Sequence, residues 1–339
     1  MKTGILLINL GTPDAPNTSK VRTYLSEFLN DRRVIDINAI GRFLLVNLII
    51  VPFRSSKSAK LYKEVWTEKG SPLLFHSQDL KNKLSASVSA NFQVELAMRY
   101  RRPRIKEALE RLRQSKVEKI IVLPLYPQYA SSTTGSTIEA VMKEIKGWEV
   151  LPELHFINNF YRNEKFIEAF SKKADNFDLN SYDHILFSYH GLPERHMRKT
   201  GKHYGDNSCK LGDCCHSITD KNQFCYRANC FETTRRIADK LNLQKEKYSI
   251  CFQSRLGRDP WIQPYTDETI KRLAKSGKKR ILVFSPSFVA DCLETVHEIG
   301  VEYNELFEEY GGEKIDLVPS LNSDDLWVEA VKDILNINN

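Results

Sequence analysis

Short runs of Val, Ile and Leu alternate with amphipathic stretches along most of the chain. The apolar runs predict strands at Gly4–Leu10, Gln93–Met98, Lys119–Leu125, Leu154–Ile157, His184–Ser188, Ser249–Gln253, Arg280–Phe284 and Ile315–Val318. The amphipathic stretches predict helices at Thr18–Asn30, Arg104–Gln114, Ser136–Ile145, Asn163–Ala174, Glu232–Leu241, Asp267–Ala274 and Asp291–Glu309. Uninterrupted apolar strands between such helices are typical of a parallel sheet covered on both faces, so the pattern predicts an α/β protein.

The same signals recur in the same order in the two halves of the chain. One strand runs into Gly11-Thr12-Pro13 and another into Gly191-Leu192-Pro193. Likewise, the stretches 98–103 and 254–260 both carry an arginine, then a proline, then a helix. This repeat predicts two similar Rossmann-like, doubly wound domains with a cleft between them, at the carboxyl ends of the strands. One large sheet with coincidental similarity is the alternative.

We place the domain boundary near residue 155. The N-terminal domain is expected at 1–155 and the C-terminal domain at 156–310. The last segment, 311–339, is expected to pack back near the first domain, and the second domain to carry a cysteine-rich insertion at 199–230.

Composition narrows the classes of protein that remain. With 339 residues, 41% hydrophobic and a net charge of +7, the chain can bury two cores and is not disordered. The charge is too dispersed to indicate nucleic-acid binding. No Gly-x-Gly-x-x-Gly or Walker loop follows a strand, so a nucleotide cofactor is not indicated.

The longest apolar run, 43–53, bears on location. Asn47 and Pro52 interrupt it, and it is shorter than the ~20 residues that span a bilayer. Because no signal peptide is evident, we expect a cytoplasmic protein. The run, with basic residues on both sides, is either a core helix or a peripheral membrane contact. The sequence leaves the oligomeric state open.

Two features at predicted strand ends can carry chemistry. His190 ends a strand, where a histidine can act as a base or a metal ligand, or simply bond its own turn. Six carboxylates follow the strand at 280–284 at spacings of three or four, which on an α-helix form one stripe. They are Asp291, Glu294, Glu298, Glu302, Glu305 and Glu309. Such a stripe is either a solvated face or a path for cations or protons.

Several motifs together resemble ferrochelatase. They are Leu7–Pro13, Gly70–Leu73, Met98–Tyr100, Leu125–Tyr129, Ser132–Ser136, Ser188–Pro193, Phe252–Arg255 and Asp291–Thr295. The matches run in the family's order over residues 4 to 305. The resemblance implies a chelatase-like fold with a porphyrin cleft between the domains. It also implies a lyase that inserts Fe(II) into protoporphyrin IX to form protohaem.

The resemblance also implies roles for individual residues. His190 and Glu294 fall on the family's catalytic and metal-binding positions, and Asp291, Glu298 and Glu302 on a path for metal or protons. Weaker matches for porphyrin contacts are Arg99, Tyr126, Ser132 and Thr133. Three alternatives remain, namely a coproporphyrin III ferrochelatase, a non-catalytic tetrapyrrole or metal-binding protein of the same fold, and a cobalt chelatase.

Five of the seven cysteines lie within 22 residues, namely Cys209, Cys214, Cys215, Cys225 and Cys230. In a reducing cytoplasm such thiols indicate a metal site rather than disulfides. Some bacterial ferrochelatases carry a [2Fe–2S] cluster, and this segment resembles an internal version of its site. We expect Cys209, Cys214, Cys215 and either Cys225 or Cys230 as ligands, with structural zinc as the first alternative and free thiols as the second.

Overall fold

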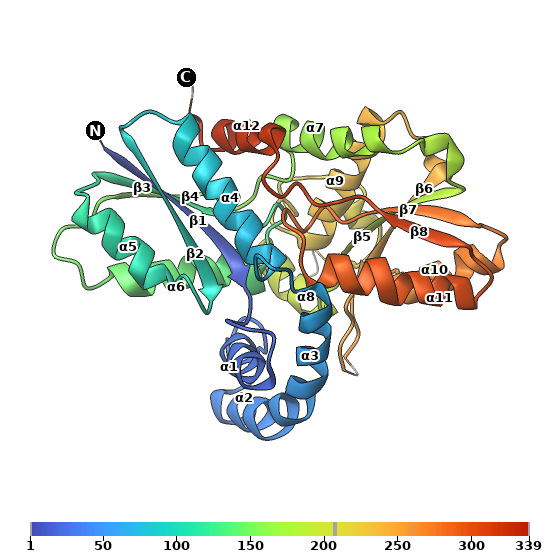
Figure 1. Cartoon of the computed structure of the whole chain (residues 1–339), viewed down its shortest axis with the longest axis horizontal. Helices are drawn as coiled ribbons and strands as arrows, with labels where there is room; N and C mark the ends of the chain where they lie inside the picture. Colours follow the sequence, from blue (N-terminus) through green and yellow to red (C-terminus); the bar gives the residue numbers. More distant parts are fainter. Residues whose placement is uncertain (1, 206–208, 258, 338–339) are drawn as a thin grey trace. The chain divides into compact units, whose positions relative to one another are not determined.

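The computed structural model describes residues 2–205, 209–257 and 259–337, which form two compact units (Figure 1). Unit 1 comprises residues 1–126, 130–159 and 323–339, and unit 2 comprises 127–129 and 160–322. Each unit contains one four-stranded parallel sheet. The α/β class predicted from the sequence is therefore confirmed.

The sheet of unit 1 has the order β2-β1-β3-β4. Its strands are β1 (Thr3–Gly11), β2 (Phe92–Tyr100), β3 (Lys119–Pro124) and β4 (Glu153–Phe156). Nearly every residue of β1 is buried, as expected for a central strand with helices on both faces.

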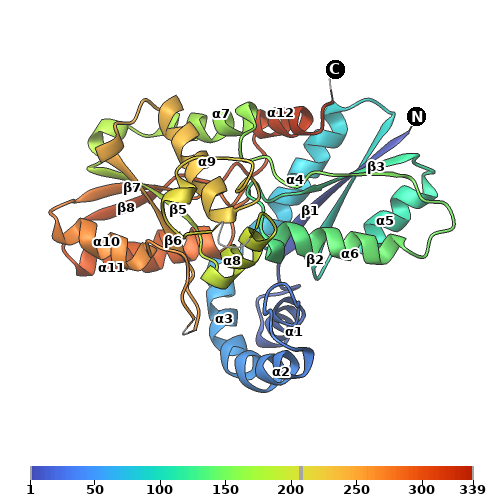
Figure 2. The ribbon, with the colours of Figure 1, turned by 180° about the vertical axis from the view of Figure 1, so that it is seen from behind.

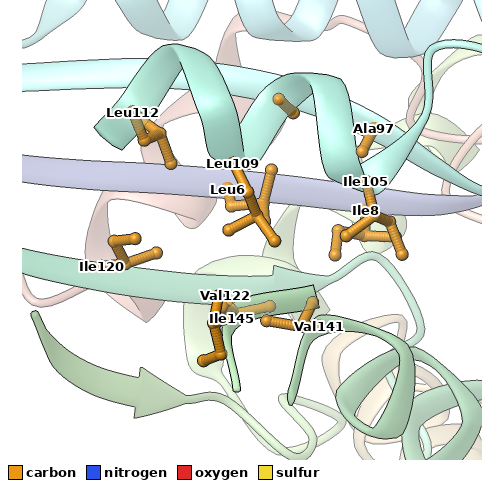
Figure 3. Packing of buried hydrophobic residues seen from close by; sticks show 11 residues of the cluster. Leu6, Ile8, Ala97, Ile105, Leu109, Leu112, Ile120, Val122, Val141 and Ile145 are labelled. Carbon is orange, nitrogen blue, oxygen red and sulfur yellow. The ribbon is translucent and has the colours of Figure 1, made fainter. Parts of the chain in front are cut away.

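Helices cover both faces of this sheet. On one face lie α5 (Ile105–Gln114) and α6 (Ser136–Ile145), and on the other α4 (Pro72–Ser87) and α12 (Asp325–Ile334) (Figures 1 and 2). Figure 3 shows how Leu6 and Ile8 of β1 meet Leu109 of α5 and Val141 of α6. Because Leu6 and Ile8 are two residues apart in the strand, their side chains lie on the same face of the sheet.

A helical arm, residues 18–65, extends unit 1. It comprises α1 (Thr18–Leu29), α2 (Ala39–Leu44), the π-helix η1 (Leu45–Ile50) and α3 (Val51–Val65). Pro52 does not end the helix, because it lies in the first turn of α3, directly after the π-helical segment η1.

The run Ala39–Val65 is consequently one continuous helical stretch of 27 residues. Within the described part of the chain this helical stretch alone is long and apolar enough to cross a membrane, judged by length and composition only. Of its apolar 18-residue segment, 17% is buried. Core helices of soluble proteins pass the same test, so this is weak evidence for a span.

Unit 2 repeats the topology of unit 1. Its sheet has the order β6-β5-β7-β8. The strands are β5 (His184–His190), β6 (Tyr248–Gln253), β7 (Arg280–Phe284) and β8 (Lys314–Leu317). The central strand of each sheet is thus the first in sequence, which explains the internal repeat.

Helices α7 (Glu164–Lys173) and α9 (Tyr226–Lys240) cover one face of this sheet, and α10 (Thr266–Lys275) and α11 (Asn304–Glu309) the other (Figure 2). Before α11 the chain forms a ten-residue π-helix, η7 (Glu294–Tyr303), in place of the expected α-helix. The remaining helix, α8 (Glu194–Lys202), follows β5.

Candidate active site

His190 is the last residue of β5, and its ring is held by its own turn. The ring Nδ1 lies 2.6 Å from the carbonyl oxygen of Gly191. Because a carbonyl can only accept, Nδ1 must carry the proton. In the neutral ring the lone pair is then on Nε2, where it can accept a proton or bind a metal. The Tyr226 hydroxyl donates to the His190 carbonyl oxygen at 2.8 Å and fixes the backbone behind the ring.

Gly191 is required by a close approach of two strand ends. Its N–H donates to the Gln253 carbonyl oxygen at 2.8 Å. A Cβ at this position would lie 2.7 Å from that oxygen and 3.1 Å from the Trp261 ring. The motif Gly191-Leu192-Pro193 therefore marks the point where β5 and β6 end together.

Gln253 connects the strand that carries His190 to the helix that carries Glu294. It pairs with His190 in the parallel ladder. Its side-chain Oε1 accepts from Ser188 at 2.8 Å, and its Nε2 donates to the Glu294 carbonyl oxygen at 2.9 Å. Because both ends of the amide are bonded, its orientation is fixed. Unit 2 thus brings the two predicted catalytic residues to one edge of its sheet.

Glu294 opens the π-helix η7 and is half-buried. The Cys292 thiol hydrogen-bonds to its side chain. Burial raises the pKa of that thiol well above its usual range, so Cys292 is a neutral donor to the Glu294 carboxylate. No pattern in the sequence connected these two residues.

The carboxylates on either side of Glu294 in the sequence do not form the single stripe that an α-helix would produce. Asp291 accepts from the Asn322 side chain at 2.8 Å and from the Ser320 N–H at 3.1 Å. Glu302 is exposed, and its Oε1 lies 3.2 Å from His297 Nε2. In the π register of η7, side chains five residues apart come within bonding distance, as those of His297 and Glu302 do.

Glu298 is the most extensively bonded of these carboxylates. Its Oε1 accepts from the Ser254 N–H at 2.9 Å and from the Tyr303 hydroxyl at 2.9 Å. Its Oε2 accepts from Gln253 Nε2 at 3.0 Å and from the Ser254 hydroxyl at 2.6 Å. Burial, reinforced by the adjacent carboxylate, raises the pKa of Tyr303, which keeps this hydroxyl a donor.

Two aromatic side chains beside His190 were not identified from the sequence. The ring centroids of Trp261 and Phe288 lie 6.5 Å and 6.4 Å from that of His190. Both residues are in loops after strands, and both are only partly buried. The available signal in the sequence was an aromatic residue in the loop that follows a predicted strand. These rings give the site an apolar rim suited to a flat aromatic ligand.

Arg99, one of the predicted porphyrin contacts, is occupied by bonds within unit 1. Arg99 donates to Asp31 at 2.6 Å and to the Ser136 hydroxyl at 2.7 Å. Although burial opposes it, hydrogen bonds from Ser136 and the charge of Arg99 hold the pKa of Asp31 below its usual value. Arg99 therefore forms an ion pair with Asp31 within unit 1.

Tyr126, Ser132 and Thr133 lie near the carboxyl end of β3. The Tyr126 hydroxyl is buried, and this burial raises its pKa. Ser132 and Thr133 belong to the short π-helix η2 (Ser131–Gly135), in which Ser132 is buried and Thr133 half-buried.

The cysteine segment contains thiols in contact. Cys214 Sγ lies 3.9 Å from Cys215 Sγ, and Cys215 hydrogen-bonds to Cys225, the N-cap of α9. This bond lowers the pKa of Cys225 and raises that of Cys215, so the pair favours a single thiolate. Cys230 is fully buried and bonds Tyr226.

These contacts do not amount to a metal site. All seven cysteines are free, and within the ranges that the structure describes no three His, Cys, Asp or Glu side chains are arranged to hold a metal ion. Residues 206–208 of the expected insertion lie outside the described residues.

Comparisons with known proteins identify the family. The family model described as Ferrochelatase matches residues 2–338. A ferrochelatase of Legionella pneumophila (strain Paris) is 46% identical over 336 residues, covering 99% of both chains. One of Coxiella burnetii (strain Dugway 5J108-111) is 44% identical, covering 97% of this chain and 92% of the relative.

Solved structures support the fold independently. SirB from Bacillus subtilis with Fe3+ aligns with a TM-score of 0.56 at 11% identity, over 99% of this chain and 95% of SirB. The sirohydrochlorin chelatase SirB in complex with cobalt, from Bacillus subtilis subspecies spizizenii, aligns with a TM-score of 0.57 at 10% identity, over 99% and 94%. At this identity the likeness shows a chelatase-like fold and nothing more. The full-length family match and the identity to the Legionella and Coxiella ferrochelatases show that the chain belongs to the ferrochelatase family, the lyases of haem biosynthesis that insert ferrous iron into a porphyrin.

Proposed function

We propose that His190 and Glu294 carry out the insertion of Fe(II) into the porphyrin. The observation that carries this proposal is the double role of Gln253, whose backbone pairs with His190 and whose amide donates to the Glu294 carbonyl oxygen. Two groups that can exchange protons or bind a metal are thereby attached to one rigid strand end. A site built on regular structure holds such groups more firmly than one on free loops.

The reaction requires that iron lose water and that two pyrrole N–H protons leave. The Nδ1–H bond to Gly191 leaves the His190 Nε2 lone pair available as a transient ligand or proton acceptor. The Glu294 carboxylate, with the Cys292 thiol as a donor, supplies the negative charge that attracts a divalent cation. Trp261 and Phe288 give the macrocycle an apolar surface beside His190.

The test is an anaerobic assay with Fe(II) or Zn(II) and porphyrin, followed by the metalloporphyrin absorption spectrum. His190→Ala and Glu294→Gln should each reduce turnover by roughly a hundred-fold or more while the protein stays folded. Near-normal turnover in either variant would refute the assignment.

We propose protoporphyrin IX, rather than coproporphyrin III, as the porphyrin substrate. Supporting this choice is the apolar arm of unit 1, which suits a hydrophobic substrate delivered at a membrane surface. Steady-state kcat/KM for the two porphyrins decides between them, and a preference for coproporphyrin III contradicts the proposal. For the porphyrin contacts of unit 1 we retain Ser132 and Thr133, and we assign Arg99 and Tyr126 to the support of that region.

We further propose that the helical arm contacts a membrane peripherally. Val46 and Val51 pack against Leu29 of α1. The rest of the stretch exposes large apolar side chains: Ile40, Phe43, Leu44, Leu48, Ile49 and Phe53. Arg54, Lys57 and Lys60 follow directly and suit anionic head groups. A cytoplasmic protein with this arm would bind the inner face of the membrane.

Finally, we propose that the cysteine segment binds a [2Fe–2S] cluster. Cys209, Cys214, Cys215 and Cys225 would hold it, because the Cys230 thiol is engaged in a hydrogen bond with Tyr226. The close pairs Cys214–Cys215 and Cys215–Cys225 support this choice. Iron and sulfide analysis with visible absorption that bleaches with dithionite tests it, and Cys230→Ser is the matched control for Cys225→Ser. A colourless protein with stoichiometric zinc would contradict the cluster.

A further inference from the structure

The Glu298 carboxylate is fully occupied by protein donors. Two donors reach each oxygen: the Ser254 N–H and Tyr303 hydroxyl at Oε1, and the Gln253 amide and Ser254 hydroxyl at Oε2. An ionised carboxylate offers about four lone-pair positions, so all of them are used. A metal ion or proton could bind only after one of these bonds had broken.

The Tyr303 bond has a spacing that depends on the π register. Residues five apart lie about 140° apart around an α-helix, which has 3.6 residues per turn. In a π-helix, whose backbone bonds run from i to i+5, they come onto one face. The bond from Tyr303 to Glu298 thus forms in η7 as observed and would be lost if the segment became α-helical.

Ser254 is held in a conformation that serves the same carboxylate. Its φ is +64°, which is uncommon for a residue other than glycine. In this conformation its N–H and its hydroxyl both reach Glu298, at 2.9 and 2.6 Å. Two charge-assisted hydrogen bonds offset the strain of this backbone position.

Gln253 links Glu298 to the proposed catalytic residue Glu294. Its Nε2 donates both to Glu298 Oε2 and to the carbonyl oxygen of Glu294, in the first turn of the same helix. We infer that Glu298 is a positioning residue that holds Glu294–Tyr303 in the π register and so fixes Glu294 beside the end of β6. It does not convey iron or protons. This inference rests on the role proposed above for Glu294.

The decisive variant is Tyr303→Phe, which removes one donor to Glu298 and keeps the ring. Loss of a hydrogen bond to a charged group should lower kcat roughly ten-fold, while KM for Fe(II) and for porphyrin and the shape of the pH–kcat profile stay unchanged. Ser254→Ala should act in the same direction. Tyr310→Phe, just beyond α11 and outside these contacts, is the matched control and should behave as the unchanged protein.

If Glu298 instead passed iron or protons to the site, the variants would behave differently. Tyr303→Phe would then be as active as the unchanged protein, and Glu298→Gln would raise KM for Fe(II) or remove one limb of the pH profile. Either result overturns the inference.

Hydrogen exchange gives a readout that does not depend on activity. Amides of residues 298–303 should exchange faster in Glu298→Gln and Tyr303→Phe than in Tyr310→Phe, and equal protection would also overturn the inference. If instead Glu294→Gln is fully active while this exchange difference is present, the proposed function fails and the role of Glu298 in holding the helix stands.

Discussion

Gln253 lies opposite His190 in the parallel pairing of β5 and β6, and its side-chain amide donates to the backbone of Glu294 at 2.9 Å. One residue therefore fixes both the strand end that carries the histidine and the helix that carries the glutamate.

Gly191→Ala should damage the site without touching a catalytic side chain. Its new Cβ would lie 2.7 Å from the Gln253 carbonyl oxygen, so β5 and β6 must separate where they end. We expect a loss of about 1–3 kcal/mol in the free energy of unfolding and at least a ten-fold fall in iron insertion. Gly147→Ala is the control, because its Cβ would meet nothing within 4 Å. Normal turnover in Gly191→Ala would show that the close approach is not needed.

Trp261→Ala should weaken porphyrin binding more than it slows chemistry. Its ring centroid lies 6.5 Å from that of His190 and offers an apolar face to a flat ligand. The KM for porphyrin should rise roughly ten-fold, and Trp261→Phe should restore most of the affinity. An unchanged KM in the alanine variant would remove Trp261 from the site.

The exposed apolar side of the helical arm should control membrane association. Phe43 and Phe53 are 59% and 80% exposed, so replacing both with serine should leave the fold intact. Binding to vesicles containing anionic lipid should fall roughly a hundred-fold in co-sedimentation, and should weaken with salt in the unchanged protein. Val150→Ser removes an equally exposed apolar side chain from another region and serves as control. Equal vesicle binding by the two variants would refute a contact through the arm.

His184 should make the protein sensitive to mild acid. Burial, helped by Lys278 and Lys247, lowers the pKa of this histidine from 6.5 to about 4. As the pH falls, this histidine takes up a proton in the unfolded chain at a higher pH than in the folded protein. The stability is therefore fully present above about pH 6.5 and falls as the pH drops toward about 4. The loss should be about 1–3 kcal/mol after allowance for solvent screening.

Urea unfolding of His184→Gln between pH 7 and 4.5 measures this contribution. The variant should show a flatter dependence of unfolding free energy on pH than the unchanged protein. His155→Gln, at an exposed position of β4, is the matched control. Parallel curves for His184→Gln and the unchanged protein would assign the acid sensitivity to other groups.

The sequence by itself determined the α/β class, the positions of the strands along the chain and the ferrochelatase family. Buried parallel strands must be uniformly apolar. This requirement repeats along the chain, so it is visible in the residues themselves. The positions of His190 at the end of β5 and of Glu294 after β7 followed from the strand pattern.

Only the tertiary structure decided how the carboxylates after Glu294 are used. The spacing predicted one α-helical stripe, whereas the segment folds as a π-helix in which Glu298 meets Tyr303. This register is supported by donors from Gln253 and Ser254, more than 40 residues earlier in the chain. Hydrogen bonds between distant segments leave no periodic trace in a sequence, and for that reason the partners of Arg99 and Glu298 emerged only when the chain was folded.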